Sequence, residues 1–138
     1  MYSKILLPID LAHADKMDKA IVTAVEVAKA HGAQLTMMGV SGEEPGSAGH
    51  DPKEYASNLE AFVEAQSKRH GIPIAALARV SVDVPAELPA LLEKEAKEHG
   101  FDVIVMASHP PGLLDHIFTS NAGHVATHSA ASVFVIRG

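Results

Sequence analysis

The sequence predicts an α/β protein, with a single domain over residues 1–138 built on a doubly wound sheet of five parallel strands in the order 3-2-1-4-5. Short apolar runs of the kind that fully buried strands require alternate with longer segments of helical apolar spacing. Strict alternation forces parallel pairing through right-handed crossovers. The composition agrees, because 47% hydrophobic residues with only 4% aromatic residues suit helices packed closely on a sheet.

Composition and charge exclude several classes of function. The chain has no cysteine, which removes disulfides, thiolate metal sites and cysteine nucleophiles. A formal net charge of −6, with 11 scattered Lys and Arg residues, argues against a surface that follows nucleic-acid phosphates. No apolar segment reaches the length of a membrane span or a secretory signal. We therefore expect a cytoplasmic protein with neither nucleic acid nor a membrane as a partner.

The first half of the chain alternates twice between strand and helix. The first apolar run ends at Asp10 and a polar loop follows it, while Gly32 caps the first helix in the left-handed conformation. Residues 43–51 are rich in Gly, Pro, Ser and acid, which is typical of a mobile loop. The expected elements are a strand over residues 4–9, a helix over 17–31, a strand over 33–40 and a helix over 52–69.

The second half continues the alternation. The step Asp83-Val84-Pro85 introduces a helix, and Pro89 is expected in its first turn, where a missing N–H costs little. The expected elements are a strand over residues 74–82, a helix ending before Gly100, a strand over 101–107, a short helix over about 120–129 and a strand over 132–136.

The chain has nine histidines, a number that invites a metal hypothesis. Three of them precede glycine at expected helix ends, where a histidine suits the negative end of the helix and glycine takes the left-handed cap, so we favour capping over metal ligation; they are His31, His70 and His99. His124 and His128 lie four residues apart on the last helix, but the sequence offers no obvious third ligand. For this pair we favour a solvated helix face.

Residues 102–121 concentrate the features that indicate a binding site. A buried strand breaks there into small, polar and ring residues. In a doubly wound sheet, ligands lie outside the carboxyl ends of the strands where the strand order reverses, here between strands one and four. Asp10 and the loop of residues 107–120 then face each other, with Val40 beside them. A helix that opens with Thr119-Ser120-Asn121 would point unpaired N–H groups at this crevice, which indicates an anion site.

From end to end, the chain resembles the universal stress protein family. The resemblance rests on the first strand with its terminal aspartate, Ile5-Leu-Leu-Pro-Ile-Asp10, on residues 33–40, on Ser132-Val-Phe-Val-Ile-Arg137, and on the loop after strand four. It implies a Rossmann-like, adenine nucleotide alpha hydrolase-like fold. It also implies a stress-response regulatory domain that binds ATP or another adenine nucleotide with little or no hydrolysis. The implied partners are a second copy, paired through strand five, and an unknown regulatory protein.

The family's signature loop is altered in this chain. The family has a glycine, two residues, a second glycine, about nine residues, and then Gly-Ser or Gly-Thr. Here Ala107 and Pro110 stand at the two glycine positions, and Thr119 precedes Ser120; the register is closest to a small bacterial subgroup with Ala-Ser-His and a later Ser-Asn-Ala. Because proline has no N–H, phosphate contact would rest on Gly112, Leu113 and the helix start at Ser120 and Asn121.

The resemblance also implies residue roles. Asp10 would hold the ribose or a magnesium ion bound to the phosphates, and the backbone of Val40 would meet the adenine. The implied nucleotide-contacting residues are Pro8, Asp10, Val40, Met106, Ala107, Ser108, His109, Gly112, Thr119, Ser120, Asn121 and Ser132. Plainer roles stay open: Asp10 as a turn acid, Ser120 as an ordinary N-cap, His109 as a loop residue bonded to a carbonyl, and Met106 as packing.

Two other functions stay open beside nucleotide binding. The first is a nucleotide-independent, dimeric interaction module, which the substituted positions Ala107, Pro110 and Thr119 favour. The second is a slow ATPase or phosphotransfer protein that uses His109 or Asp10. No pair of catalytic base and nucleophile has supporting spacing, so we expect no catalytic residue and no enzyme.

Overall fold

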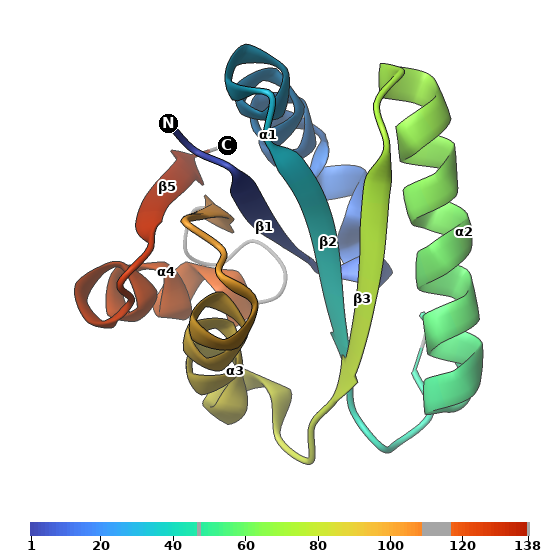
Figure 1. The fold of residues 1–138 in the computed structure, drawn as a ribbon. Helices are drawn as coiled ribbons and strands as arrows, with labels where there is room; N and C mark the ends of the chain where they lie inside the picture. The colour runs from blue at the N-terminus through green and yellow to red at the C-terminus, as the bar shows by residue number, and fades with distance from the viewer. Residues whose placement is uncertain (47, 109–116, 138) are drawn as a thin grey trace.

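The computed structural model describes residues 1–46, 48–108 and 117–137, without the side chains of Pro85 and of residues 117–122. Strands and helices alternate along the whole chain (Figure 1). The elements are β1 (Lys4–Ile9), the 3-10 helix η1 (Leu11–Lys16), α1 (Asp18–His31), β2 (Gln34–Ser41), α2 (Pro52–His70), β3 (Ile74–Val80), α3 (Val84–His99), β4 (Val103–Ser108), α4 (Ile117–His128) and β5 (Ser132–Arg137).

The five strands form one parallel sheet in the order β3-β2-β1-β4-β5, which confirms the predicted topology. Helices α1 and α2 cover one face, and α3 and α4 cover the other (Figure 1). Alternate side chains of β1 enter the two layers: Ile5 and Leu7 pack with α1 and α2, whereas Leu6 packs with α3 and α4. Both faces of β1 are therefore buried, as its continuous apolar run predicts.

The helix ends follow the predicted chemistry. Gly32, Gly71 and Gly100 all take the left-handed conformation, with φ of 63°, 70° and 69°, directly after the three histidines. At the opposite ends, Asp51 accepts a hydrogen bond from the N–H of Glu54 at 2.7 Å, and Asp83 caps α3. The capping interpretation of His31, His70 and His99 is confirmed, because each lies in the last turn before a left-handed glycine.

Three local predictions were wrong. The polar segment after Asp10 forms the 3-10 helix η1 instead of a loop. Pro89 lies inside α3 and not in its first turn, because Asp83 caps the helix early enough for it to begin at Val84. Helix α4 begins at Ile117 instead of about Ser120. The apolar residues Ile117 and Phe118 extend the helical run in the amino-terminal direction, so Ser120 is an interior helical residue and not the N-cap.

Asp102 joins the starts of the two central strands β1 and β4. Its Oδ2 accepts hydrogen bonds from the backbone N–H and the hydroxyl of Ser3, at 2.9 and 3.0 Å, and its Oδ1 accepts one from the N–H of Lys4 at 3.0 Å. Burial raises the pKa of this carboxyl, but the three donors outweigh burial and hold the pKa below its ordinary value. The charged carboxylate therefore fixes β1 beside β4 at the amino edge of the sheet.

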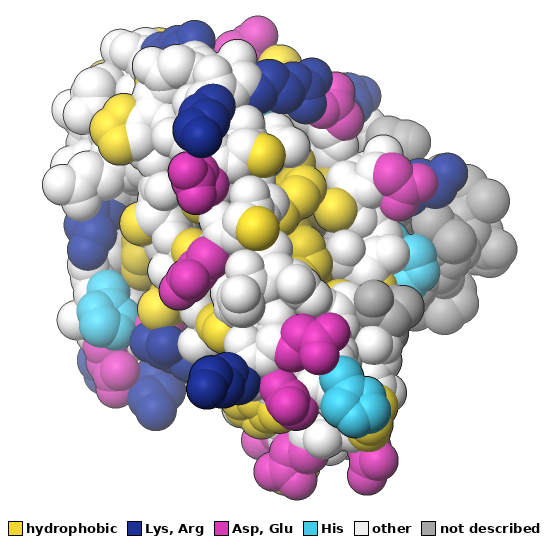
Figure 2. All heavy atoms as spheres, turned by 90° about the vertical axis from the view of Figure 1, so that its right-hand side faces the viewer, with side chains coloured by type: hydrophobic (Ala, Val, Ile, Leu, Met, Phe, Trp, Pro, Cys, Tyr) yellow, Lys and Arg dark blue, Asp and Glu magenta, His cyan; other side chains and the backbone are white. Residues whose placement is uncertain are grey.

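The side of the molecule formed by α2 carries acidic and basic side chains interspersed with apolar ones (Figure 2). Two ion pairs account for part of this pattern: Lys68 with Glu64 at 3.2 Å, and Arg69 with Asp18 at 2.6 Å. A mixed surface of this kind offers no continuous basic track for phosphates on this face. In the part of the chain that the structure describes, no helix combines the length and the apolar character needed to cross a membrane.

Candidate functional site at the carboxyl edge of the sheet

The strands β1 and β4 separate at the point where the sheet order reverses. Strand β1 pairs with β2 from Lys4↔Gln34 to Ile9↔Gly39, but with β4 it pairs only at Ile5↔Val103 and Leu6↔Ile104. The carboxyl halves of β1 and β4, which the structure describes in full, are therefore not paired with each other. This opening is the place where doubly wound sheets bind their ligands.

A cleft lies at this edge, beside the ends of β1 and β2. A small, narrow cavity touches Pro8, Asp10 and Val40, together with Met38, Val84 and Leu88. It adjoins a wider cleft of about 350 Å³ that also contains Asp10, Val40 and Val84. That volume lies within the range of about 300–1,000 Å³ found for small-molecule sites. The predicted residues Pro8, Asp10 and Val40 are thus brought together on one cleft.

Among the described residues, Asp10 is the one acidic residue that lines both the small cavity and the wider cleft. Its side chain is only 14% exposed, and its Oδ2 lies 3.0 Å from Nδ1 of His13. The backbone N–H of His13 also donates to the carbonyl oxygen of Asp10, so the first turn of η1 holds both residues together. When the neutral ring donates from Nδ1 to this carboxylate, its acceptor lone pair lies on Nε2. Asp10 is therefore positioned by its neighbour.

Tyr55 of α2 forms the wall of the wider cleft. It is 6% exposed, and burial, with the negative charge of Asp10 as a second cause, raises the pKa of its hydroxyl above the ordinary value. A Cβ at Gly39 would lie 2.6 Å from the Tyr55 hydroxyl oxygen, and one at Gly49 would lie 2.7 Å from the Tyr55 backbone. Both glycines are therefore required by close approach to Tyr55, which remains neutral at physiological pH.

The segment predicted to be a mobile loop forms part of this wall. Gly46 and Gly49 exchange backbone hydrogen bonds of 3.0 and 3.2 Å, and Asn58 of α2 donates to the carbonyl of Ala48 at 2.9 Å. The cleft is lined here by Glu44, Gly46, Ala48, Gly49 and Asp51. The segment thus turns over the cleft beside Asp10.

The other predicted site residues fall into four groups. Met106, Ala107 and Ser108 end β4 at the same edge and are buried, but they line neither cavity. Ser132 begins β5 at the opposite edge, where it accepts a hydrogen bond from Tyr2, so the structure does not bring it to Asp10. His109 and Gly112, with Pro110 and Leu113, lie outside the described residues. Thr119, Ser120 and Asn121 belong to α4, and their side chains are not described.

The start of α4 at Ile117 changes which groups could meet an anion. The unpaired N–H groups of a helix are those of its first turn. In the described part of α4 the first turn contains Ile117, Phe118 and Thr119, which precede the predicted Ser120 and Asn121. Sequence reasoning also missed His13, although an aspartate and a histidine three residues apart in one turn are placed to bond to each other.

Comparison with known proteins gives matches over the whole fold. A model of the universal stress protein family matches residues 1–137. Universal stress protein G of Salmonella typhimurium is 26% identical over 147 residues, which cover 99% of this chain and 100% of that protein. The match therefore spans nearly all of this chain and all of that protein.

Two solved structures share the fold. One is a universal stress protein in complex with cAMP, with a TM-score of 0.66 and 20% identity, covering 98% of this chain and 97% of the other. The second is the universal stress protein from Archaeoglobus fulgidus in complex with dAMP, with a TM-score of 0.63 and 20% identity, covering 98% of each chain. With the five-stranded parallel sheet and the family match over residues 1–137, the chain belongs to the universal stress protein family.

Proposed function

We propose that this chain is a regulatory domain that binds an adenine nucleotide in the cleft at the carboxyl ends of β1 and β2, with little or no hydrolysis. One observation carries the proposal: the largely buried residue Asp10, which follows the central strand β1 at its carboxyl end, lines a cleft of about 350 Å³ at this edge of the sheet. Complexes of two proteins of the same fold with cAMP and dAMP support the ligand class.

The residues of the cleft fit the parts of a nucleotide. Val40 offers apolar contact to a base, and the adjoining main chain of β2 can bond to its edge. Asp10 accepts hydrogen bonds from ribose hydroxyls, or holds a magnesium ion that the phosphates bring with them. The first-turn N–H groups of α4 would meet the phosphates, whose negative charge the positive end of the helix favours. ATP fits this description, as does a nucleotide with fewer phosphates.

Binding can be tested by calorimetry with ATP and magnesium, AMP, dAMP and cAMP on the unaltered protein. We expect saturable binding of at least one of them at or below millimolar concentration, with a matching rise in melting temperature. Absence of binding by all four would contradict the proposal and favour the nucleotide-independent interaction module. Release of phosphate from ATP that is lost in both Asp10→Ala and His109→Ala would favour the slow ATPase instead.

We also propose that the domain pairs with a second copy through β5. Strand β5 is an edge of the sheet, and Val135 on it is 38% exposed although it is apolar. An edge of this kind presents unpaired backbone groups that a second copy can cover. Sedimentation equilibrium is expected to give twice the mass of the chain, 29.0 kDa from 2 × 14.5 kDa, and Val135→Lys is expected to shift the protein toward the monomer. A wild-type protein that stays monomeric at high concentration would contradict this interface.

A further inference from the structure

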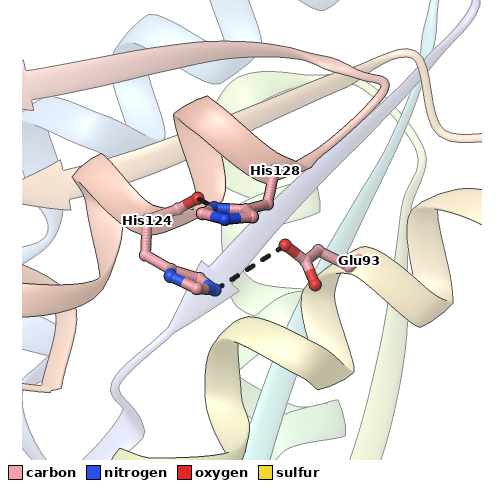
Figure 3. Close-up of side chains that lie close together, drawn as sticks. All are labelled: Glu93, His124 and His128. Atoms are coloured by element: carbon pink, nitrogen blue, oxygen red, sulfur yellow. Dashed lines mark hydrogen bonds and ion pairs between the residues drawn. The ribbon is translucent and has the colours of Figure 1, made fainter.

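Three side chains of metal-binding type meet on the face formed by α3 and α4, away from Asp10. His124 and His128 of α4 stack with their ring centroids 4.1 Å apart and an angle of 18° between the rings. Glu93, on the neighbouring helix α3, points toward these two histidines (Figure 3). The pair lies on an exposed helix face, as the sequence predicts, and the structure adds a carboxylate beside it that the sequence does not reveal.

The hydrogen bonds of His128 leave one ring nitrogen for a ligand. Its Nδ1 lies 2.9 Å from the backbone carbonyl oxygen of His124. A carbonyl only accepts, so the proton of the neutral ring sits on Nδ1 and the lone pair sits on Nε2. Thr127 lies 2.9 Å from the same Nδ1, which further fixes the ring. Metal-binding histidines are held in this way, with the second nitrogen bonded to a backbone carbonyl.

The Glu93 carboxylate, on a side chain that is 30% exposed, points toward the two histidines (Figure 3). Its Oε1 is buried and has no hydrogen-bond donor within the described ranges. Nε2 of His124 lies 3.9 Å from this oxygen, beyond hydrogen-bond reach. One ligand atom from each of the three residues lies within 4.8 Å of the others. Two ligand atoms on a tetrahedral zinc ion, each about 2.0–2.1 Å from the metal, are separated by roughly 3.4 Å, so side-chain shifts of about 1 Å close the site.

We propose that Glu93, His124 and His128 bind one zinc-type divalent ion that joins α3 to α4, with its remaining coordination position open to water. Two imidazoles and one carboxylate form a donor set that zinc accepts and that magnesium, which prefers oxygen ligands in octahedral geometry, does not. Lys97 lies one turn after Glu93 and lines the same groove as His128. The ion would replace the 3.9 Å contact between Glu93 and His124 with three coordinate bonds.

Calorimetric titration of the chelator-treated full chain with Zn²⁺, without nucleotide, tests the site. We expect one tight equivalent per chain, and an affinity lower by at least about tenfold in both His128→Ala and Glu93→Gln. The matched controls are His50→Ala, an exposed histidine in the loop before α2, and Glu60→Gln, an exposed glutamate on α2, and both should bind like the wild type. Mg²⁺ should give no heat of binding at the same concentration.

Two outcomes would overturn the proposal. One is the absence of a tight zinc equivalent in the wild type, and the other is an equal loss of affinity in His50→Ala and His128→Ala. Visible absorption of bound Co²⁺ gives a second readout, because ligation by His124 and His128 changes the cobalt spectrum and a purely structural role does not. Since no nucleotide is present, failure here leaves the proposed nucleotide site untouched, and failure of nucleotide binding leaves the zinc site untouched.

Discussion

Replacing Asp10 with alanine is expected to weaken AMP binding by about 10- to 100-fold, because a hydrogen bond to a charged group contributes roughly 1.5–3 kcal/mol. The effect should be smaller for dAMP, which lacks the 2′-hydroxyl that the carboxylate would accept from. Calorimetry of wild type and Asp10→Ala with both ligands gives the comparison directly. The ratio of the two affinities should move toward one in the variant, whereas a simple loss of fold would lower both equally.

The design includes controls for charge and for metal. Asp15→Ala removes the same charge from an exposed position in η1 and should leave AMP affinity unchanged. If Asp10 acts through magnesium instead of the ribose, its substitution will weaken ATP binding only when magnesium is present. Because Asp10 also bonds to His13, circular dichroism should confirm that the variant is folded. A folded Asp10→Ala protein that binds AMP and magnesium ATP like the wild type would contradict the role of Asp10.

Arg79→Met is expected to lower the free energy of unfolding by about 3 kcal/mol, because it leaves a buried carboxylate without its main partner. Nε of Arg79, on β3, donates to Oε1 of Glu95, on α3, at 2.6 Å, and the Glu95 side chain is only 4% exposed. His99 Nε2 lies 3.1 Å from the other oxygen, but at an angle that does not form a hydrogen bond. The lower end of the usual range applies since Arg79 itself is 35% exposed. Urea unfolding measures the change.

A surface ion pair of the same length provides the comparison. Arg69 and Asp18 also meet at 2.6 Å, but their side chains are 51% and 58% exposed. Arg69→Met should therefore cost no more than about 1 kcal/mol. Arg79→Met combined with Glu95→Leu should recover most of the lost stability, because neither member of this pair then carries a charge. Equal losses in Arg69→Met and Arg79→Met would show that burial of Glu95 does not matter.

The order of strands and helices could be predicted because each element carries its own local pattern. The apolar run before Asp10, the helical spacing before Gly32 and the histidine–glycine ends are all short-range signals. The start of α4 could not be predicted from the residue type of Ser120 alone. A serine suits an N-cap, but Ile117 and Phe118 before it also fit a helix, and residue type does not choose between the two.

The site was predictable only where it depends on topology. Once the sheet order is known, Asp10 and Val40 must lie at the same edge, and they do. Side-chain contacts between two different helices leave no pattern in the sequence that would predict them. Glu93 and His124 are 31 positions apart on different helices, and neither residue type indicates that the two meet. The family resemblance implied Ser132 as a site residue. The register Val103↔Ser132 instead puts it at the amino ends of the strands, opposite to the end at which Asp10 lies.

The central position of β1 also constrains the order in which the sheet can be completed. Synthesis delivers β1, β2 and β3 with α1 and α2 first, and these elements are neighbours in space. The other side of β1 has to wait for β4, since Lys4 bonds to Asp102 across a separation of 98 residues. Until then the apolar strand presents an uncovered edge, which is the kind of surface that promotes aggregation in nascent chains. Closing the seam between β1 and β4 is the long-range step, and loop-closure entropy makes such steps slow.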